Sequence, residues 1–131
     1  MVRVAIIGFG GIAQSHKNAY LTLEKQGIPV KLIAVCDINP EKFTAVQKIN
    51  IATENVDGVF RYYTDYREML EKEEITLVDI CLPTHLHPSY TIEMLESGYD
   101  VLCEKPMSTS EEKCREMIAA AEKSGRRLMI G

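Results

Sequence analysis

The feature that most constrains this chain is a glycine-rich segment that directly follows a short apolar run at Val2–Ile7. The segment reads Gly8-Phe9-Gly10-Gly11-Ile12-Ala13, and a helical pattern begins within it. In G-x-G-x-x-G/A turns that join a strand to a helix, the first glycine permits the tight turn and the second lets the backbone approach a pyrophosphate. The small third residue, here Ala13, keeps the helix close to the strand. The pattern therefore predicts a phosphate-binding turn whose helix N-terminus offers N–H groups to an anion.

A second apolar run strengthens this interpretation. Val30–Cys36 is typical of a buried strand and ends at Asp37. In dinucleotide-binding folds a carboxylate at about this distance past the glycines accepts hydrogen bonds from the adenosine ribose. The two features together favour a dinucleotide-binding domain.

Length and charge exclude several other classes. The chain has 131 residues, which suits one domain with a real core and leaves little for a second. Its formal net charge of −4, without a basic stripe, argues against nucleic acid as a partner. No apolar stretch is long enough to span a bilayer, so no membrane is expected as a partner. The first apolar run leads straight into the glycines, which indicates no signal peptide and predicts a cytoplasmic location.

The cysteines indicate neither disulfides nor a metal site. Cys36, Cys81, Cys103 and Cys114 form no C-x-x-C pair, and no histidine stands at metal-ligand spacing from them. Three of them end apolar runs, and we interpret them as small buried residues of a reduced protein. No metal is expected, and a zinc-type site is the alternative that this spacing disfavours.

Apolar runs and helical stretches alternate along the chain, which predicts right-handed βαβ units and an α/β fold. Strands are expected at Val2–Ile7, Val30–Cys36, Val59–Tyr62, Leu77–Leu82, Tyr99–Cys103 and Leu128–Ile130. Helices are expected at Gly11–Gln26, from Asn39 through Ile49, from Asp65 through Leu70, from His87 to Gly98 and from Glu111 to Ser124, with Ile51–Gly58 as a loop. The expected architecture is a doubly wound parallel sheet with strand order 3-2-1-4-5-6, because the glycine motif follows the first strand.

Ligands of such sheets bind beyond the carboxyl ends of the strands. The glycines and Asp37 are therefore expected to hold the adenosine and pyrophosphate half of a dinucleotide. The segments Leu82–Pro88 and Glu104–Pro106 follow the fourth and fifth strands and are expected to face the nicotinamide half. Lys105, with His85 and His87 opposite, makes a plausible reaction site. Alternatively, the histidines are loop and helix-entry residues, Thr84 caps a turn and Glu104 forms a solvated pair with Lys105.

These motifs together resemble the N-terminal domain of the glucose–fructose oxidoreductase / inositol dehydrogenase (Gfo/Idh/MocA) family. The resemblance rests on Gly8-x-Gly10-x-x-Ala13, on Pro83 to His87 and on Glu104-Lys105-Pro106, and it covers essentially the whole chain. Glu-Lys-Pro directly after the fifth strand is its most specific part. The family usually has Thr-Pro-Asn-x-x-His after the fourth strand. Here Pro83 and His87 match, whereas Leu82 and Thr84 depart from the pattern.

The resemblance implies an oxidoreductase that transfers a hydride between a secondary alcohol of a sugar, cyclitol or related polyol and a nicotinamide cofactor. It places Lys105 near the nicotinamide and in contact with a substrate hydroxyl, with a cis peptide bond before Pro106. It assigns cofactor contacts to the glycine segment and to Asp37, Leu82, Pro83, Thr84, His87, Glu104, Lys105 and Pro106.

The resemblance also implies a second, α+β domain that holds most of the substrate pocket and the general base. Residues 1–131 would then be the dinucleotide-binding domain, with the substrate domain absent after Gly131 and the full-length enzyme a homo-oligomer. The chain by itself is expected to bind cofactor weakly, to turn over nothing and to expose apolar surface at its carboxyl edge.

NAD is expected in preference to NADP. The Asp37 carboxylate would accept hydrogen bonds from the ribose hydroxyls and repel a 2′-phosphate, and Ile38 offers no positive charge. Lys42 is the one residue that could swing toward a phosphate.

Three other functions stay open at this point. The chain could be a non-enzymatic dinucleotide-binding sensor or scaffold, or part of a glycosidase of the same family that uses NAD transiently. A glycine-rich first turn and an acid after the second strand also suit the S-adenosylmethionine of a methyltransferase, although Glu104-Lys105-Pro106 speaks against that function.

Overall fold

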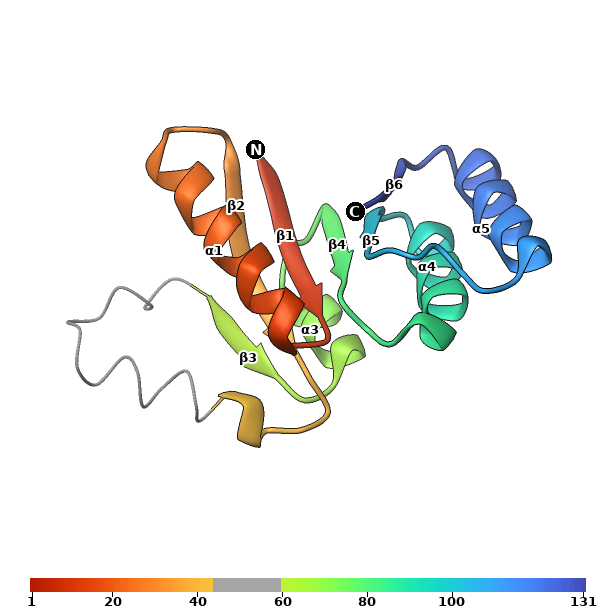
Figure 1. Ribbon diagram of the computed structural model, residues 1–131. Helices are drawn as coiled ribbons and strands as arrows, with labels where there is room; N and C mark the ends of the chain where they lie inside the picture. Colours follow the sequence, from red (N-terminus) through yellow and green to blue (C-terminus); the bar gives the residue numbers. More distant parts are fainter. Residues whose placement is uncertain (44–59) are drawn as a thin grey trace.

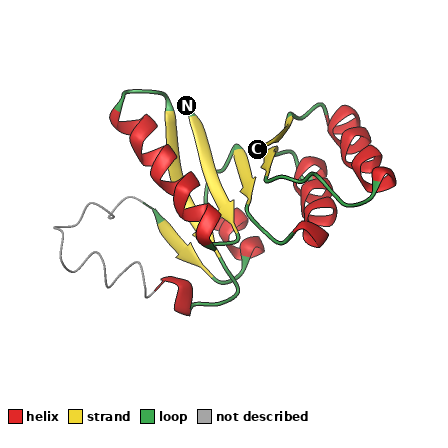
Figure 2. Cartoon of the chain, viewed as in Figure 1, coloured by secondary structure: helices red, strands yellow, loops and turns green. Residues whose placement is uncertain are grey.

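The computed structural model describes residues 1–43 and 60–131. Its described strands form one parallel sheet in the order β3-β2-β1-β4-β5-β6, as predicted, and Figures 1 and 2 show the strand arrows running the same way. The strands are β1 (Val2–Ile7), β2 (Val30–Cys36), β3 (Arg61–Tyr63), β4 (Leu77–Ile80), β5 (Asp100–Cys103) and β6 (Leu128–Ile130). The order reverses beside β1, so the ends of β1 and β4 face a crevice of the kind in which ligands bind.

Helices cover both faces of the sheet. Helix α1 lies against β1 and β2, whereas α4 and α5 pack together on the opposite face (Figure 1). The helices are α1 (Gly11–Lys25), α3 (Tyr66–Lys72), α4 (His87–Glu96) and α5 (Glu111–Ser124), and a short 3₁₀ turn, η1 (Thr84–Leu86), precedes α4. This is the doubly wound α/β architecture that the alternating pattern predicts.

Local sequence signals explain where the helices begin and end. The Asp65 side chain accepts a hydrogen bond from the Arg67 N–H at the start of α3, and the Ser110 side chain accepts one from the Lys113 N–H at the start of α5. Such caps satisfy N–H groups that a helix cannot satisfy internally. Gly125 ends α5 in the left-handed region, with φ +66°, where a residue without Cβ is favoured.

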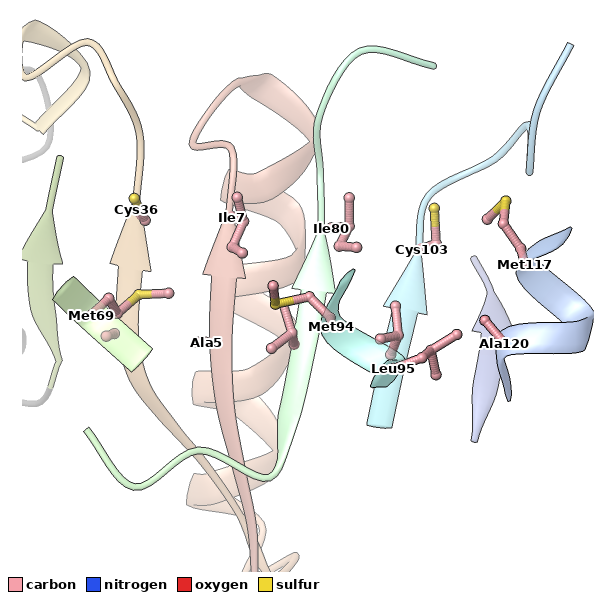
Figure 3. Packing of buried hydrophobic residues seen from close by; sticks show 13 residues of the cluster. Ala5, Ile7, Cys36, Met69, Ile80, Met94, Leu95, Cys103, Met117 and Ala120 are labelled. Atoms are coloured by element: carbon pink, nitrogen blue, oxygen red, sulfur yellow. The ribbon is translucent and has the colours of Figure 1, made fainter. Parts of the chain in front are cut away.

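The core lies in two layers, one on each face of the sheet. Alternate residues of β1 enter different layers, since Val4 and Ile6 face α1 whereas Ala5 and Ile7 face the other helices. Figure 3 shows the second layer, in which side chains from β1, β4 and β5 meet those of the helices. Its helical members include Met69 of α3, Met94 and Leu95 of α4, and Met117 and Ala120 of α5.

Several predicted boundaries differ from those of the structure by one or two residues. The third strand begins at Arg61 instead of Val59, because its pairing partner is only the end of β2, from Ala34 to Cys36. The fourth ends at Ile80 instead of Leu82, and the fifth begins at Asp100. The predicted helix after Asn39 is described only as far as Phe43. Its continuation, the loop Ile51–Gly58 and Val59 lie outside the described residues.

The cysteine prediction holds in part. Cys36, Cys81 and Cys103 are buried and not disulfide-bonded, whereas Cys114 is half-buried on α5. Cys81 is not in purely apolar surroundings, since its Sγ lies 3.6 Å from Nδ1 of His16. The fold therefore brings together a cysteine and a histidine that no sequence spacing pairs. Among the described residues, no helix is both long enough and apolar enough to cross a membrane.

Candidate dinucleotide site

The turn after β1 requires glycine at its first position. Gly8 has φ +90°, and a Cβ built on it would lie 2.6 Å from the backbone oxygen of Cys81. The Gly8 N–H donates to the Cys36 carbonyl at 2.8 Å. Gly8 thus lets β1 end against both neighbouring strands and turn sharply toward α1.

The start of α1 is open toward the carboxyl edge of the sheet. Its N-cap residue is Gly10, which has no side chain to cap the first N–H groups, and a Cβ at Gly10 or Gly11 would meet nothing within 4 Å. Ala13 is fully buried, so the helix packs closely on the sheet, whereas Ile12 is exposed. An uncapped helix N-terminus with open space before it can accept an anionic group such as a pyrophosphate.

Asp37 stands beside this turn as a partly neutralised carboxylate. Its Oδ2 accepts hydrogen bonds from the Phe9 N–H at 2.7 Å and from Lys42 Nζ at 2.8 Å, and its Oδ1 accepts one from the Asn39 N–H at 2.9 Å. Burial alone would raise the pKa of Asp37, but these hydrogen bonds outweigh burial and hold the pKa below its ordinary value. Asp37 is therefore ionised at neutral pH and acts as an acceptor. Phe9 contributes only its N–H here, because its side chain is buried in the core.

A cavity of about 220 Å³ connects Asp37 with the loop after β4. The glycine turn, Asp37 and Lys42 line one side, and Leu82, Pro83 and Leu86 line the other. Ile38, 89% exposed, lies at its rim. Apolar walls beside an acceptor carboxylate suit the flat base and the hydroxyl groups of an adenosine. The sequence predicted that Leu82 and Pro83 face the nicotinamide half of the cofactor. In the structure they also line the same cavity as Asp37.

The two histidines of the loop after β4 differ in their surroundings. His85 is exposed on η1. His87 is 1% exposed, and its ring nitrogens lie 2.8 Å from the carbonyl oxygens of Leu82 and Pro106. Its ring therefore joins the loop after β4 to the loop after β5 and has no surface left for a ligand. Thr84 is half-buried in η1, next to Pro83.

The tripeptide after β5 places one exposed cation at the carboxyl edge of the sheet. The Lys105–Pro106 peptide bond is cis, as predicted. Lys105 is exposed, and none of the described residues accepts a hydrogen bond or ion pair from its Nζ. Its N–H donates to Oε2 of the preceding Glu104 at 3.1 Å. An ammonium group at this edge is available to a ligand oxygen.

The Glu104 side chain turns away from the crevice into a polar cluster that the motifs did not reveal. Its Oε1 lies 3.0 Å from Nε2 of His16, and the Nδ1 of that ring lies 2.8 Å from Oδ2 of Asp79. Asp79 is fully buried in β4 and also accepts hydrogen bonds from the Tyr20 hydroxyl at 2.7 Å and from Cys81 Sγ at 3.5 Å. The cluster ties α1, β4 and the loop after β5 together.

Ligand atoms of His16, Asp79 and Cys81 lie within 4.8 Å of one another and make the one group of metal-ligating type among the described residues. The 2.8 Å separation of Nδ1 and Oδ2 is that of a hydrogen bond. Two ligands of one tetrahedral zinc ion would lie about 3.3 Å apart. The geometry is therefore that of a hydrogen-bonded network, and the absence of a metal stays a prediction.

Sequence reasoning missed His16, Tyr20 and Asp79, although two signals were present. His16 and Tyr20 stand four residues apart on α1, which places them on one face of the helix. Asp79 is a lone acid inside the apolar run Leu77–Leu82, where a buried strand normally carries no charge. A charge in that position calls for partners on the neighbouring helix.

The turn, the open helix start, the acceptor after β2 and the crevice beside β1 define a Rossmann-type dinucleotide-binding domain. A profile of the oxidoreductase family with an NAD-binding Rossmann fold (GFO_IDH_MocA) matches residues 2–131, and the chain belongs to this family.

The relatives with a named activity include dehydrogenases of sugars and cyclitols. The chain is 33% identical to D-glucoside 3-dehydrogenase of Escherichia coli over 126 residues, which is 95% of this chain and 33% of that protein. It is 29% identical to inositol 2-dehydrogenase of Pseudomonas savastanoi over 129 residues, 98% of this chain and 35% of that protein. A solved structure of WlbA dehydrogenase from Bordetella pertussis, in complex with NADH and UDP-GlcNAcA, superposes with a TM-score of 0.80 at 29% identity and covers 99% of this chain and 36% of WlbA. The chain thus spans about a third of the length of these relatives.

Proposed function

We propose that this chain is the cofactor domain of a dehydrogenase that transfers a hydride between a secondary alcohol of a sugar, cyclitol or related polyol and NAD. The observation that carries the proposal is the meeting of three features at one sheet edge: the Gly8 turn with its open helix start, the Asp37 cavity and the exposed Lys105. The relatives act on substrates of this class by name, which supports the same class here.

The residues present fit a dinucleotide. Asp37 would accept hydrogen bonds from the adenosine ribose, and the N–H groups at the start of α1 would bind the pyrophosphate. The apolar walls of the cavity at Leu82, Pro83 and Leu86 would hold the adenine. Glu104, Lys105 and Pro106 would border the nicotinamide, while Thr84 and His87 shape the loop between the two halves. When bound, NAD supplies the hydride acceptor.

Lys105 would act on the substrate oxygen. Its ammonium group would donate a hydrogen bond to the alcohol oxygen and stabilise the negative charge that develops as the proton and the hydride leave. The turn fixes the place of that oxygen and hence aligns the reacting C–H bond with the cofactor. A general base must take the hydroxyl proton. We propose that this base lies in a second domain of the same protein.

A binding and turnover assay tests the function. NADH titrated into the purified full-length protein, with the proposed second domain, is expected to show saturable fluorescence enhancement. A panel of inositols, glucosides and other polyols with NAD is expected to give NADH formation with at least one member, whereas residues 1–131 alone are expected to give none. Saturable binding without turnover of any polyol would contradict the dehydrogenase and favour a sensor. Binding of S-adenosylmethionine in place of NADH would overturn the cofactor assignment.

The cofactor preference rests on Asp37. We predict that NADH binds at least about tenfold more tightly than NADPH, which corresponds to about 1.4 kcal/mol, because the ionised carboxylate repels a 2′-phosphate. Asp37→Ala is expected to lower the ratio of the NADPH to the NADH dissociation constant. Lys42→Met is expected to increase that ratio, because the ammonium group that lies 2.8 Å from Asp37 Oδ2 is then lost. Calorimetric titration with both cofactors measures the two dissociation constants.

Asp100→Ala is the matched control for this prediction. Asp100 forms an ion pair with Arg127 at the opposite, amino edge of the sheet, so its removal should leave the ratio of the two affinities unchanged. Equal or tighter binding of NADPH by the unaltered protein would refute the preference.

We also propose that the rest of the protein covers an apolar depression on the α1 face of the sheet. This depression of about 300 Å³ is lined by Val2, Leu77, Leu102 and Met129, and Met129 is 66% exposed. Amide hydrogen exchange of β6 should be slower in a chain that continues past Gly131 than in residues 1–131 alone.

A cytoplasmic location and a homo-oligomeric state remain predictions, which cell fractionation and sedimentation would check.

A further inference from the structure

We propose that His16 is a positioning residue for Lys105: its imidazolium ring holds the Glu104 carboxylate, which in turn holds the backbone N–H of Lys105 at the carboxyl edge of the sheet. The inference deepens the proposed function and rests on it for the role of Lys105. The contacts themselves are independent of that role. His16 Nε2 on α1 lies 3.0 Å from Glu104 Oε1, and the Lys105 N–H donates a hydrogen bond to Glu104 Oε2 at 3.1 Å.

The position of Asp79 favours a role beyond stability. A fully buried carboxylate loses its hydration, and well-packed apolar residues in its place are often at least as stabilising. In β4 it is compensated by Tyr20, His16 and Cys81. Asp79 thus fixes one nitrogen of the His16 ring, and the other nitrogen is then directed at Glu104. The buried charge orients a ring that reaches the loop carrying Lys105.

Both acceptors of the ring are carboxylates, so the ring must carry two protons to donate to both. Burial lowers the pKa of His16, but the hydrogen bonds and charges of Asp79 and Glu104 outweigh burial, and the pKa is raised above 6.5. The other titratable groups of the cluster are Tyr20 and Cys81. Burial and the charge of Asp79 raise the pKa of both, so they stay protonated across the neutral range.

Loss of the second proton breaks one of the two contacts. Asp79 is fully buried, whereas the Glu104 side chain keeps 12% exposure and can be hydrated. The remaining proton therefore stays with Asp79, and Glu104 is released. The His16 contribution is complete below about 6.5, the pKa of an unfolded histidine, and is lost as pH rises through the raised folded value. Positioning of Lys105 should follow the same curve.

An NMR titration of protein labelled with ¹⁵N-lysine tests this link without an activity assay. The Lys105 amide is expected to shift between pH 5.5 and 9 with a midpoint above about 6.5, coincident with the titration of the His16 ring. His16→Gln should abolish the step while NADH still binds. His85→Gln, which changes an exposed histidine of the neighbouring loop, should keep it. If His16→Gln fails to fold, the coincidence of the two midpoints in the unaltered protein still decides.

Comparing kcat with the NADH dissociation constant distinguishes a positioning role of His16 from a purely structural one. With the polyol that the wild type oxidises, His16→Gln is expected to lower kcat about tenfold, less than the hundredfold that a 1 Å misplacement can cost, with an unchanged NADH dissociation constant. The wild-type kcat is expected to fall as pH rises, with the same midpoint as the titration of His16. The kcat of His16→Gln is expected to lack this fall. A Lys105 amide that does not titrate with His16, or an unchanged kcat in the folded variant, overturns the proposal. Absence of any polyol oxidation by the wild type counts against the proposed function alone, because the NMR titration does not depend on it.

Discussion

Lys105→Met is expected to lower kcat and kcat/KM for polyol oxidation together by about 10²–10³-fold, the usual effect of removing one group that stabilises transition-state charge. The ammonium group is exposed at the carboxyl edge and has no protein acceptor among the described residues, so its removal costs no internal contact. Methionine keeps the length and apolar stem of the side chain. Equal losses in kcat and kcat/KM indicate an interaction made only in the transition state.

Lys123→Met is the matched control. Lys123 is exposed in the last turn of α5, which lies at the amino edge of the sheet because β6 follows it. The same chemical change there should leave kcat, KM and the NADH dissociation constant unchanged. A Lys105→Met protein that keeps wild-type kcat would exclude Lys105 from the reaction.

Gly8→Ala is expected to be the most destabilising single-methyl substitution in the cofactor site, with a loss of about 3 kcal/mol in the free energy of unfolding. Two effects add. The backbone φ of +90° is disfavoured for any L side chain, and the new Cβ would lie 2.6 Å from the Cys81 oxygen, so β1 and β4 would have to separate. Urea unfolding followed by circular dichroism measures the loss.

Two other glycines divide this effect into its parts. Gly27 has φ +78° but nothing within 4 Å of a built Cβ, so Gly27→Ala carries the backbone penalty alone, about 1 kcal/mol. Gly10→Ala meets no protein atom and should leave stability nearly unchanged. The methyl group would nevertheless stand where a pyrophosphate approaches, so NADH binding should weaken at least about tenfold. Equal stability losses for Gly8→Ala and Gly27→Ala would show that the contact with Cys81 is not limiting.

The periodic parts of the fold followed from local sequence. Val30–Cys36 is an apolar run of strand length, and its bounds were predicted correctly because burial on both faces leaves Lys31 as the one polar residue inside it. Ser110 and Gly125 gave the limits of α5 because capping depends on neighbours in the chain. The beginning of β3 could not be predicted locally, because it depends on how far β2 extends beside it.

For the candidate site, the sequence predicted the positions that depend on the backbone. Gly8 needs a positive φ, Asp37 follows a strand and Lys105 precedes a proline, and each of these is a property of a few adjacent residues. Their convergence at one edge follows from parallel strands, whose carboxyl ends meet. The family resemblance added the cis bond before Pro106 and the place of Lys105.

What the side chains of that edge contact was decided only by the tertiary structure. The sequence predicted His87 as a cofactor contact, yet the fold buries its ring between the carbonyl oxygens of Leu82 and Pro106. Glu104 turns toward His16, 88 residues earlier in the chain. Helix periodicity and strand alternation are local and therefore legible in one sequence. Hydrogen bonds between distant side chains depend instead on how the helix and the strands pack, and that packing is determined by the whole core.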